Sequence, residues 1–184
     1  MFDFEKFMKW LAGVDKDTPH ESKYHKESFY QHVVSVASMA SKYGDRVLFI
    51  AALLHDVGKP ATVNYREGKG YTFYNHETAG GNIINQFLTE DDEDYQTIMD
   101  LVRWHMLPYQ LNGPEPYRSY AEKQLLGLVQ THDSQFISRQ FALHKFDDES
   151  AYGGNIATLV PAMRSVIYTY YDNFGDEQSL YPKH

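Results

Sequence analysis

The sequence has no cysteine, which excludes disulfide bonds, zinc–thiolate sites and a thiol nucleophile. It has no apolar run near the roughly 20 residues that a membrane-spanning helix needs, and its first residues do not follow the basic-then-apolar pattern of a secretory signal. It also lacks an excess of positive charge: the formal net charge is −8, so no global basic field attracts long duplex nucleic acid. We therefore expect a cytoplasmic protein with no membrane contact and no long duplex partner.

What the sequence does contain is typical of one folded domain. Its 184 residues are 42% hydrophobic and 23% charged, which is ordinary globular composition. No internal repeat, low-complexity tract or linker divides the chain. We predict a single domain over residues 1–184, with a loosely ordered tail at 174–184.

Apolar residues recur at helical spacing along most of the chain and predict an all-α fold. The predicted helices cover residues 4–11, 29–44, 47–54, 79–87, 95–102, 119–131, 134–152 and 155–172. The run at 47–54 is apolar almost all round and predicts a buried helix that stops at Gly58 and Pro60. Residues 61–74 predict a short hairpin or extended loop, and 107–117, with three prolines, predicts a loop.

The adjacent pair His55 and Asp56 ends the most apolar of these helices. Burying two such side chains without partners costs several kcal/mol, so the pair needs a metal or a dense polar network. Further candidate ligands lie on other predicted helices, which is how helical bundles build metal sites: His32, His76, His105 and Asp147. Imidazole and carboxylate ligands suit Mn, Fe, Co, Ni or Zn. Taken singly, each histidine could equally be an ordinary packed or exposed side chain.

The string from Ala52 to Pro60, ALLHDVGKP, resembles the signature of the HD-domain metal-dependent phosphohydrolases. Three further strings are similar to successive motifs of one branch of that superfamily: YHKE at 24–27 with Gln31-His32, FYNHE at 73–77 and VRWHM at 102–106. The branch is the HD domain of bacterial tRNA nucleotidyltransferases and poly(A) polymerases, with its stand-alone relatives. The likeness covers about residues 20–152 and implies an HD-domain helical bundle.

The resemblance implies four ligands for a first divalent metal: His32, His55, Asp56 and Asp147. Asp147 is preferred because the segment that it ends is similar to a late motif of the family. Asp133 is the competing candidate for this fourth ligand, and Asp148 is a weaker one.

The resemblance also implies a second metal. His76 and His105 match the positions of its ligands, and Asp56 would bridge the two ions. Met106 stands where some binuclear relatives have a second consecutive histidine, so the occupancy of the second site stays open.

The implied function is the hydrolysis of a phosphate ester of a nucleotide or nucleic-acid end by a metal-activated hydroxide. Relatives suggest a 2′,3′-cyclic phosphodiesterase, a phosphatase or a nucleotidase. The alternatives are a nucleotide-binding module without turnover and, less favoured, a di-iron oxygenase. Each predicts different chemistry at the same ligands.

Beside the ligands, we expect catalytic roles for Asp56 and Lys59 and substrate contacts from Lys59, Arg103 and His25. The alternative for Lys59 is a surface lysine, and for Arg103 it is a salt bridge that supports the site. No functional role is expected for the remaining histidines: His20, His132, His144 and His184.

Overall fold

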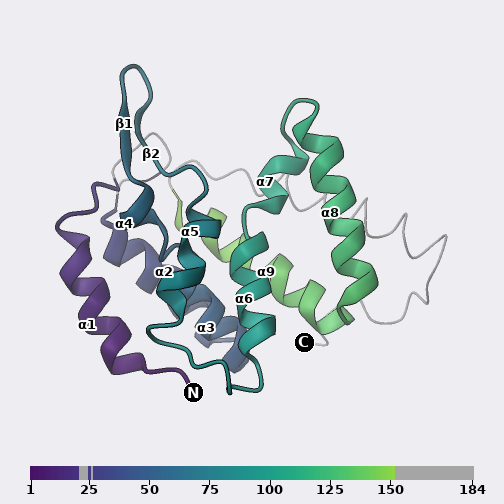
Figure 1. Cartoon of the computed structure of the whole chain (residues 1–184), viewed down its shortest axis with the longest axis horizontal. Coiled ribbons are helices and arrows are strands. Elements are labelled where there is room, and N and C mark those ends of the chain that lie inside the picture. Colours follow the sequence, from purple (N-terminus) through teal and green to yellow (C-terminus); the bar gives the residue numbers. More distant parts are fainter. Residues whose placement is uncertain (21–24, 26, 152–184) are drawn as a thin grey trace.

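The computed structural model describes residues 1–20, 25 and 27–151. The helix predicted at 155–172 and the tail predicted at 174–184 lie outside the described residues. In chain order the elements are α1 Phe4–Asp15, α2 Phe29–Ser41, α3 Arg46–Leu54, α4 Lys59–Thr62, β1 Asn64–Arg66, β2 Gly70–Thr72, α5 His76–Ile84, α6 Tyr95–Trp104, α7 Leu107–Leu111, α8 Tyr117–Thr131 and α9 Ser134–Ser150 (Figure 1). The predicted all-α class with one short hairpin is therefore confirmed.

Several helices begin where a polar side chain satisfies a free backbone N–H group. In each case the capping oxygen accepts a hydrogen bond from the residue three positions later, which stabilises a helix by about 1 kcal/mol. The caps are Asp3 for α1, Ser28 for α2, Asp45 for α3 and Asp133 for α9. These caps fix where the helices start and therefore which side chains face the interior.

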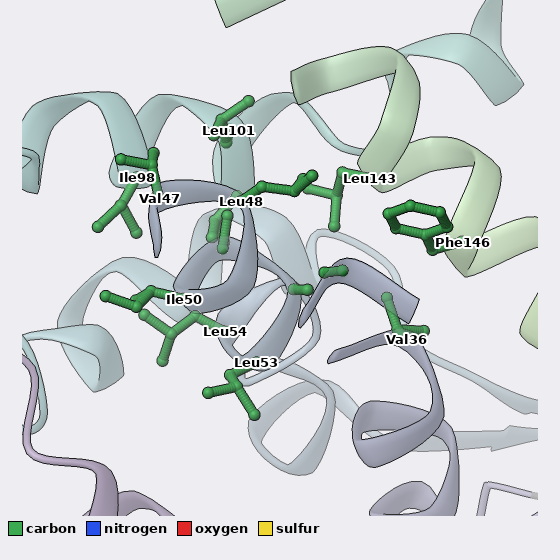
Figure 2. Packing of buried hydrophobic residues seen from close by; sticks show 14 of the residues in the cluster. Val36, Val47, Leu48, Ile50, Leu53, Leu54, Ile98, Leu101, Leu143 and Phe146 are labelled. Atoms are coloured by element: carbon green, nitrogen blue, oxygen red, sulfur yellow. The ribbon is translucent and has the colours of Figure 1, made fainter. Parts of the chain in front are cut away.

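Helix α3 lies at the centre of the core, as its uniformly apolar sequence predicted. It packs against α2, α6 and α9, and its Leu48 and Leu54 are almost completely buried. Figure 2 shows α3 side chains gathered with Leu101 of α6 and Leu143 of α9. Burying one such side chain stabilises the fold by roughly 1.5–3 kcal/mol. The helix that ends at the His–Asp pair is thus held firmly from three sides.

The hairpin joins β1 and β2 in antiparallel register, with Tyr65 opposite Tyr71. Gly68 and Gly70 have φ angles of 75° and 76°, a left-handed conformation that glycine adopts without strain. The hairpin projects from the helical body (Figure 1).

The prediction of a loop at 107–117 was wrong over its first half, because residues 107–111 form α7. Pro108 lies in the first turn of that helix, where a backbone N–H group is not needed. Pro60 similarly lies in the first turn of the short helix α4, just after the predicted stop. In both places proline starts a helix rather than ending one.

None of the helices in the described part of the chain combines the length and apolar character that crossing a bilayer requires.

Candidate metal centre

The side chains predicted as metal ligands meet at the ends of five helices. His32 lies in the first turn of α2, His55 follows α3, and His76 begins α5. His105 follows α6, and Asp147 lies in the last turn of α9. Together with Asp56, all of them are buried. The bundle therefore brings the predicted ligands, which are distant in sequence, to one interior point.

Asp56 lies between two groups of these side chains. Its Oδ2 atom is 3.3 Å from His32 Nε2 and 3.2 Å from His55 Nε2. Its Oδ1 atom is 3.0 Å from His76 Nε2 and 3.7 Å from His105 Nε2. Each carboxylate oxygen thus faces one pair of imidazoles, which is the arrangement expected of a residue shared between two sites.

Asp147 completes the first of these groups. Its Oδ1 atom lies 3.2 Å from His32 Nε2 and 3.8 Å from His55 Nε2. The ligand atoms of His32, His55 and Asp147 all lie within 4.8 Å of one another, and so do those of a second group, Asp56, His76 and His105. These two groups lie on either side of Asp56, and a third group that meets the same distance, His20, His25 and His32, shares His32 with the first.

Backbone carbonyl groups fix the orientation of three of the imidazoles. The Nδ1 atoms lie 2.8 Å from Ala52 O in His55, 2.7 Å from Phe73 O in His76 and 2.6 Å from Val102 O in His105. A carbonyl oxygen can only accept, so Nδ1 carries the hydrogen and donates it. The Nε2 atom of each ring is then left with a free lone pair directed at the centre, as metal ligation requires.

His32 is oriented by side chains instead. Its Nδ1 atom lies 3.2 Å from Glu27 Oε1 and 2.9 Å from Ser150 Oγ. Because a carboxylate only accepts, Nδ1 of His32 is also the protonated nitrogen. All four rings therefore present Nε2 to the centre.

The donor set fits a divalent transition metal. The Nε2 atoms of His32 and His55 are 3.3 Å apart, and those of His76 and His105 are 3.1 Å apart. Two lone pairs at such distances repel each other unless a proton or a cation lies between them. In addition, Asp56 Oδ2 is buried without a hydrogen bond of good geometry. Mixed imidazole and carboxylate donors favour Mn, Fe, Co, Ni or Zn.

The charges around His32 also favour a cation at this point. Burial lowers the pKa of His32, but hydrogen bonds with Asp147, Asp56 and Glu27 outweigh it and raise the pKa to about 10. The pKa of Asp147 lies well below its usual range, because the same histidine outweighs the effect of burial. The surrounding carboxylates therefore favour positive charge at His32.

Lys59 is buried beside the carboxylate rather than exposed. Its Nζ atom lies 2.5 Å from Asp56 Oδ2 and 3.0 Å from His20 Nε2. The Nδ1 atom of His20 faces the carbonyl oxygen of Glu27 at 3.3 Å, so Nε2 accepts from the lysine. Burial, with the nearby charge of Lys59, lowers the pKa of His20 to about 2. The imidazole is thus neutral and helps to hold the ammonium in place.

Sequence reasoning gave His20 no role, yet this side chain is only 2% exposed and lies inside the site. Its ring centroid is 4.1 Å from that of His25 and 5.1 Å from that of His32. His20 belongs to no apolar helical stripe, so no pattern in its surroundings indicated this position. Its neighbour His25, predicted to contact substrate, is partly buried with Nδ1 2.9 Å from Glu27 Oε1.

The rival candidates for the late ligand are absent from the groups of donors found in the described residues. Asp133 is the N-cap of α9, where its Oδ1 atom accepts from Phe136 N at 2.8 Å. It precedes Asp147 by fourteen residues, roughly 20 Å along the helix. Asp148 is buried, and its Oδ1 atom lies 3.4 Å from the hydroxyl of Tyr109.

Arg103 does not enter the metal centre. Its side chain is exposed on α6, with the guanidinium carbon 5.3 Å from the ring centroid of Trp104. No ion pair of Arg103 occurs within the part of the chain that the structure describes. The predicted salt bridge is therefore not observed there, whereas a substrate contact remains open to this side chain.

Two of the other histidines that were expected to lack a site role have packing contacts. His132 stacks on Phe136 with ring centroids 3.8 Å apart. His144 is fully buried beside Tyr109, and burial lowers its pKa to about 4. His184 lies outside the described residues.

Gly58 lies where the turn that follows Asp56 packs against the backbone of α5. A Cβ atom at this position would collide with the carbonyl oxygen of His76 and would lie 2.7 Å from Gly80 N. The turn that carries Asp56 therefore rests directly on the backbone of α5, which carries His76. Only glycine permits so close an approach.

A helical bundle whose helix ends direct four imidazoles and two carboxylates to a buried centre can hold divalent metal ions. The HD domain family matches residues 29–140, and the chain belongs to this family. Proteins of this family are generally metal-dependent hydrolases. No curated protein and no solved structure matches the chain.

Proposed function

We propose that the protein is a phosphohydrolase that cleaves a phosphate ester of a nucleotide or of a nucleic-acid end. The observation that carries the proposal is Asp56, whose two oxygens face two pairs of imidazoles while Lys59 Nζ lies 2.5 Å away. The first group of donors, His32, His55, Asp56 and Asp147, would hold one divalent ion. His76 and His105 would hold a second ion, with Asp56 shared between the two.

One or two divalent ions at these residues would lower the pKa of a bound water and offset negative charge on a phosphoryl group. The residues of the chain do the rest. Carbonyl acceptors on Nδ1 hold the imidazole planes, and Glu27 does the same for His32. The ammonium of Lys59, held between Asp56 and His20, supplies a fixed positive charge for a phosphate oxygen. No protein nucleophile is required.

The motifs at 24–27, 73–77 and 102–106 support a finer proposal. They favour the branch of HD domains found in tRNA nucleotidyltransferases and their stand-alone relatives, and with it 2′,3′-cyclic phosphodiesterase or phosphatase activity. The net charge of −8 favours a small substrate over a long polyanion.

The test is hydrolysis by the full chain loaded with Mn, Co or Ni. Substrates are 2′,3′-cyclic AMP, AMP and bis-p-nitrophenyl phosphate, and metal content is measured on the same samples. Asp56→Ala is expected to lower kcat by about 1,000-fold or more. Asp3→Ala, which removes a carboxylate from the cap of α1, is the control and should retain activity.

Equal activity of the Asp56→Ala protein would overturn the proposal. Tight binding of a nucleotide by a metal-loaded protein that turns nothing over would favour a binding module instead. Iron-dependent oxygen consumption with a polyol would favour an oxygenase.

A further inference from the structure

A cavity of about 610 Å³ is lined by residues of α5, α6, α7 and the start of α8. This volume is within the roughly 300–1,000 Å³ of typical small-molecule sites. The cavity is separate from the ligand atoms, because no predicted metal ligand lines it. The metal centre thus leaves this cavity unexplained.

The cavity nevertheless borders the second group of ligands. Glu77, which lines it, follows His76 directly in α5, and Trp104, which also lines it, precedes His105 at the end of α6. Consecutive residues of a helix point in different directions. The histidines therefore turn inward to Asp56 while their neighbours turn to the cavity. The cavity and the second group of ligands are therefore built from adjacent residues of the same two helices.

The cavity wall is rich in exposed aromatic side chains. Tyr117 and Tyr120 are three residues apart in the first turn of α8, so they lie on one face of it. They are 63% and 53% exposed, respectively. Trp104 lies in the same lining. Aromatic side chains left in contact with water beside a cavity provide flat apolar faces on which a base can stack.

The polar groups of the cavity fit a nucleotide as well. Arg103 lies against Trp104 and has no ion pair within residues 1–20, 25 and 27–151. Its guanidinium is therefore available to a phosphate oxygen or to the face of a base. Glu77 and Gln110 line the same space and offer acceptors and donors to ring nitrogens or ribose hydroxyls.

We propose that this cavity is the base subsite of the enzyme, in which Tyr117, Tyr120 and Trp104 stack on the aromatic base of a nucleotide substrate. The proposal rests on the proposed phosphohydrolase function and names its substrate class: phosphate esters that carry a nucleobase, in preference to sugar phosphates without one. Arg103, which also lines the cavity, would contact the base or a phosphate oxygen.

The first experiment compares AMP with ribose 5-phosphate, which has the same sugar and phosphate but no base. For the wild-type protein we expect a KM about 10- to 100-fold lower for AMP. The double variant Tyr117→Ala/Tyr120→Ala should lose this preference, because its KM for AMP should rise to that for ribose 5-phosphate. The variant Tyr117→Phe/Tyr120→Phe keeps both rings and should retain the preference.

Tyr43→Ala serves as the matched control, because Tyr43 is 51% exposed and follows the end of α2 opposite to His32. The Tyr43→Ala protein should prefer AMP over ribose 5-phosphate as strongly as the wild type does. An equal KM for both substrates in the wild type, or an unchanged preference in the double alanine variant, would overturn the base subsite.

A second readout does not depend on turnover. The chain has two tryptophans, so in a Trp10→Phe background the fluorescence of Trp104 reports on the cavity alone. AMP should quench this fluorescence, ribose 5-phosphate should not, and the double alanine variant should bind AMP at least about 10-fold more weakly.

The two proposals fail in different ways. Binding of AMP that depends on the tyrosines, without hydrolysis of any ester, would retain the subsite and reject the phosphohydrolase. Hydrolysis without any effect of the base would retain the phosphohydrolase and reject the subsite.

Discussion

The Nζ atom of Lys59 lies 2.5 Å from Oδ2 of Asp56, so a buried ammonium is paired with the carboxylate that faces all four imidazoles. The charge of Lys59 helps to hold the pKa of Asp56 well below its usual range, although burial acts in the opposite direction. In the proposed function, this ammonium is the positive charge that would contact a phosphate oxygen.

Replacing this lysine should separate catalysis from metal binding. We expect Lys59→Ala to lower kcat for phosphate esters by about 100-fold, because a fixed charge next to the phosphoryl group is lost. Metal content per chain should not fall, since the imidazoles and carboxylates remain. The control is Lys145→Ala, whose ammonium is 3.8 Å from Glu149 on the surface. A variant with normal kcat, or one that loses its metal, would contradict this role.

Substitution of the aspartates at the two ends of α9 should affect metal affinity differently. Asp147→Asn removes an anion 3.2 Å from His32 Nε2, and we expect metal affinity to fall by about 100-fold or more. Asp133→Asn keeps a good N-cap and should leave metal affinity and activity unchanged. Metal titration followed by competition with a chelator measures both. Loss of metal from the Asp133 variant would reverse the assignment.

The second group of ligands should control the number of ions bound. His76→Ala and His105→Ala each remove a donor from that group, so we expect the metal content to fall from about two ions per chain to about one. His132→Ala, which removes an imidazole stacked on Phe136, is the control and should change nothing. Elemental analysis of the purified proteins gives the ratio. Unchanged stoichiometry in both variants would mean that these histidines hold no ion.

Asp45 links the start of α3 to α9 and should give the protein a pH-dependent part of its stability. Its Oδ1 atom accepts from Leu48 N at 3.0 Å, and its Oδ2 atom accepts from Arg139 Nε at 2.8 Å. Burial raises the pKa of Asp45, but these partners outweigh it and lower the pKa. The stabilisation is therefore complete above the unfolded-state pKa of about 3.9 and is lost as the pH falls through the lower folded-state value.

Asp45→Asn keeps the cap of α3 and loses the charge. We expect it to lower the free energy of unfolding by about 1 kcal/mol at pH 7 and by clearly less at pH 3. Thermal melting of both proteins at the two pH values measures the difference. An equal loss at both pH values would show that the charge of Asp45 contributes nothing.

The candidate metal centre was predictable only in part from local signals. An apolar helix that runs into His55 and Asp56 requires partners, and helical periodicity placed further candidates on separate helices. The choice of the ligand set followed from the resemblance to the HD-domain family. The choice between Asp133 and Asp147 was not predictable from the residues alone. Both belong to the same helix, and only the packing of α9 against α2 brings its C-terminal end to the centre.

Features that depend on contacts between distant segments could not be predicted. His20 contacts Lys59, which is 39 residues away in sequence, and no local pattern indicates such a contact. The cavity depends on α7, a helix that was not predicted because residues 107–117 contain three prolines, of which Pro108 lies in its first turn. The exposure of Tyr117 and Tyr120 likewise depends on how α8 packs, because a tyrosine is equally suited to a core and to a surface.

The close approach of Gly58 to the backbone of α5 bears on which core residues can be substituted without moving the ligands. Because main chain rests on main chain there, the separation of Asp56 from His76 does not depend on which side chains fill the surrounding core. Apolar residues of α3 and α6 can therefore be exchanged for others of similar size without altering the spacing of the two groups of ligands. In a redesign of this scaffold, the apolar core residues could be varied, whereas Gly58 would have to be kept.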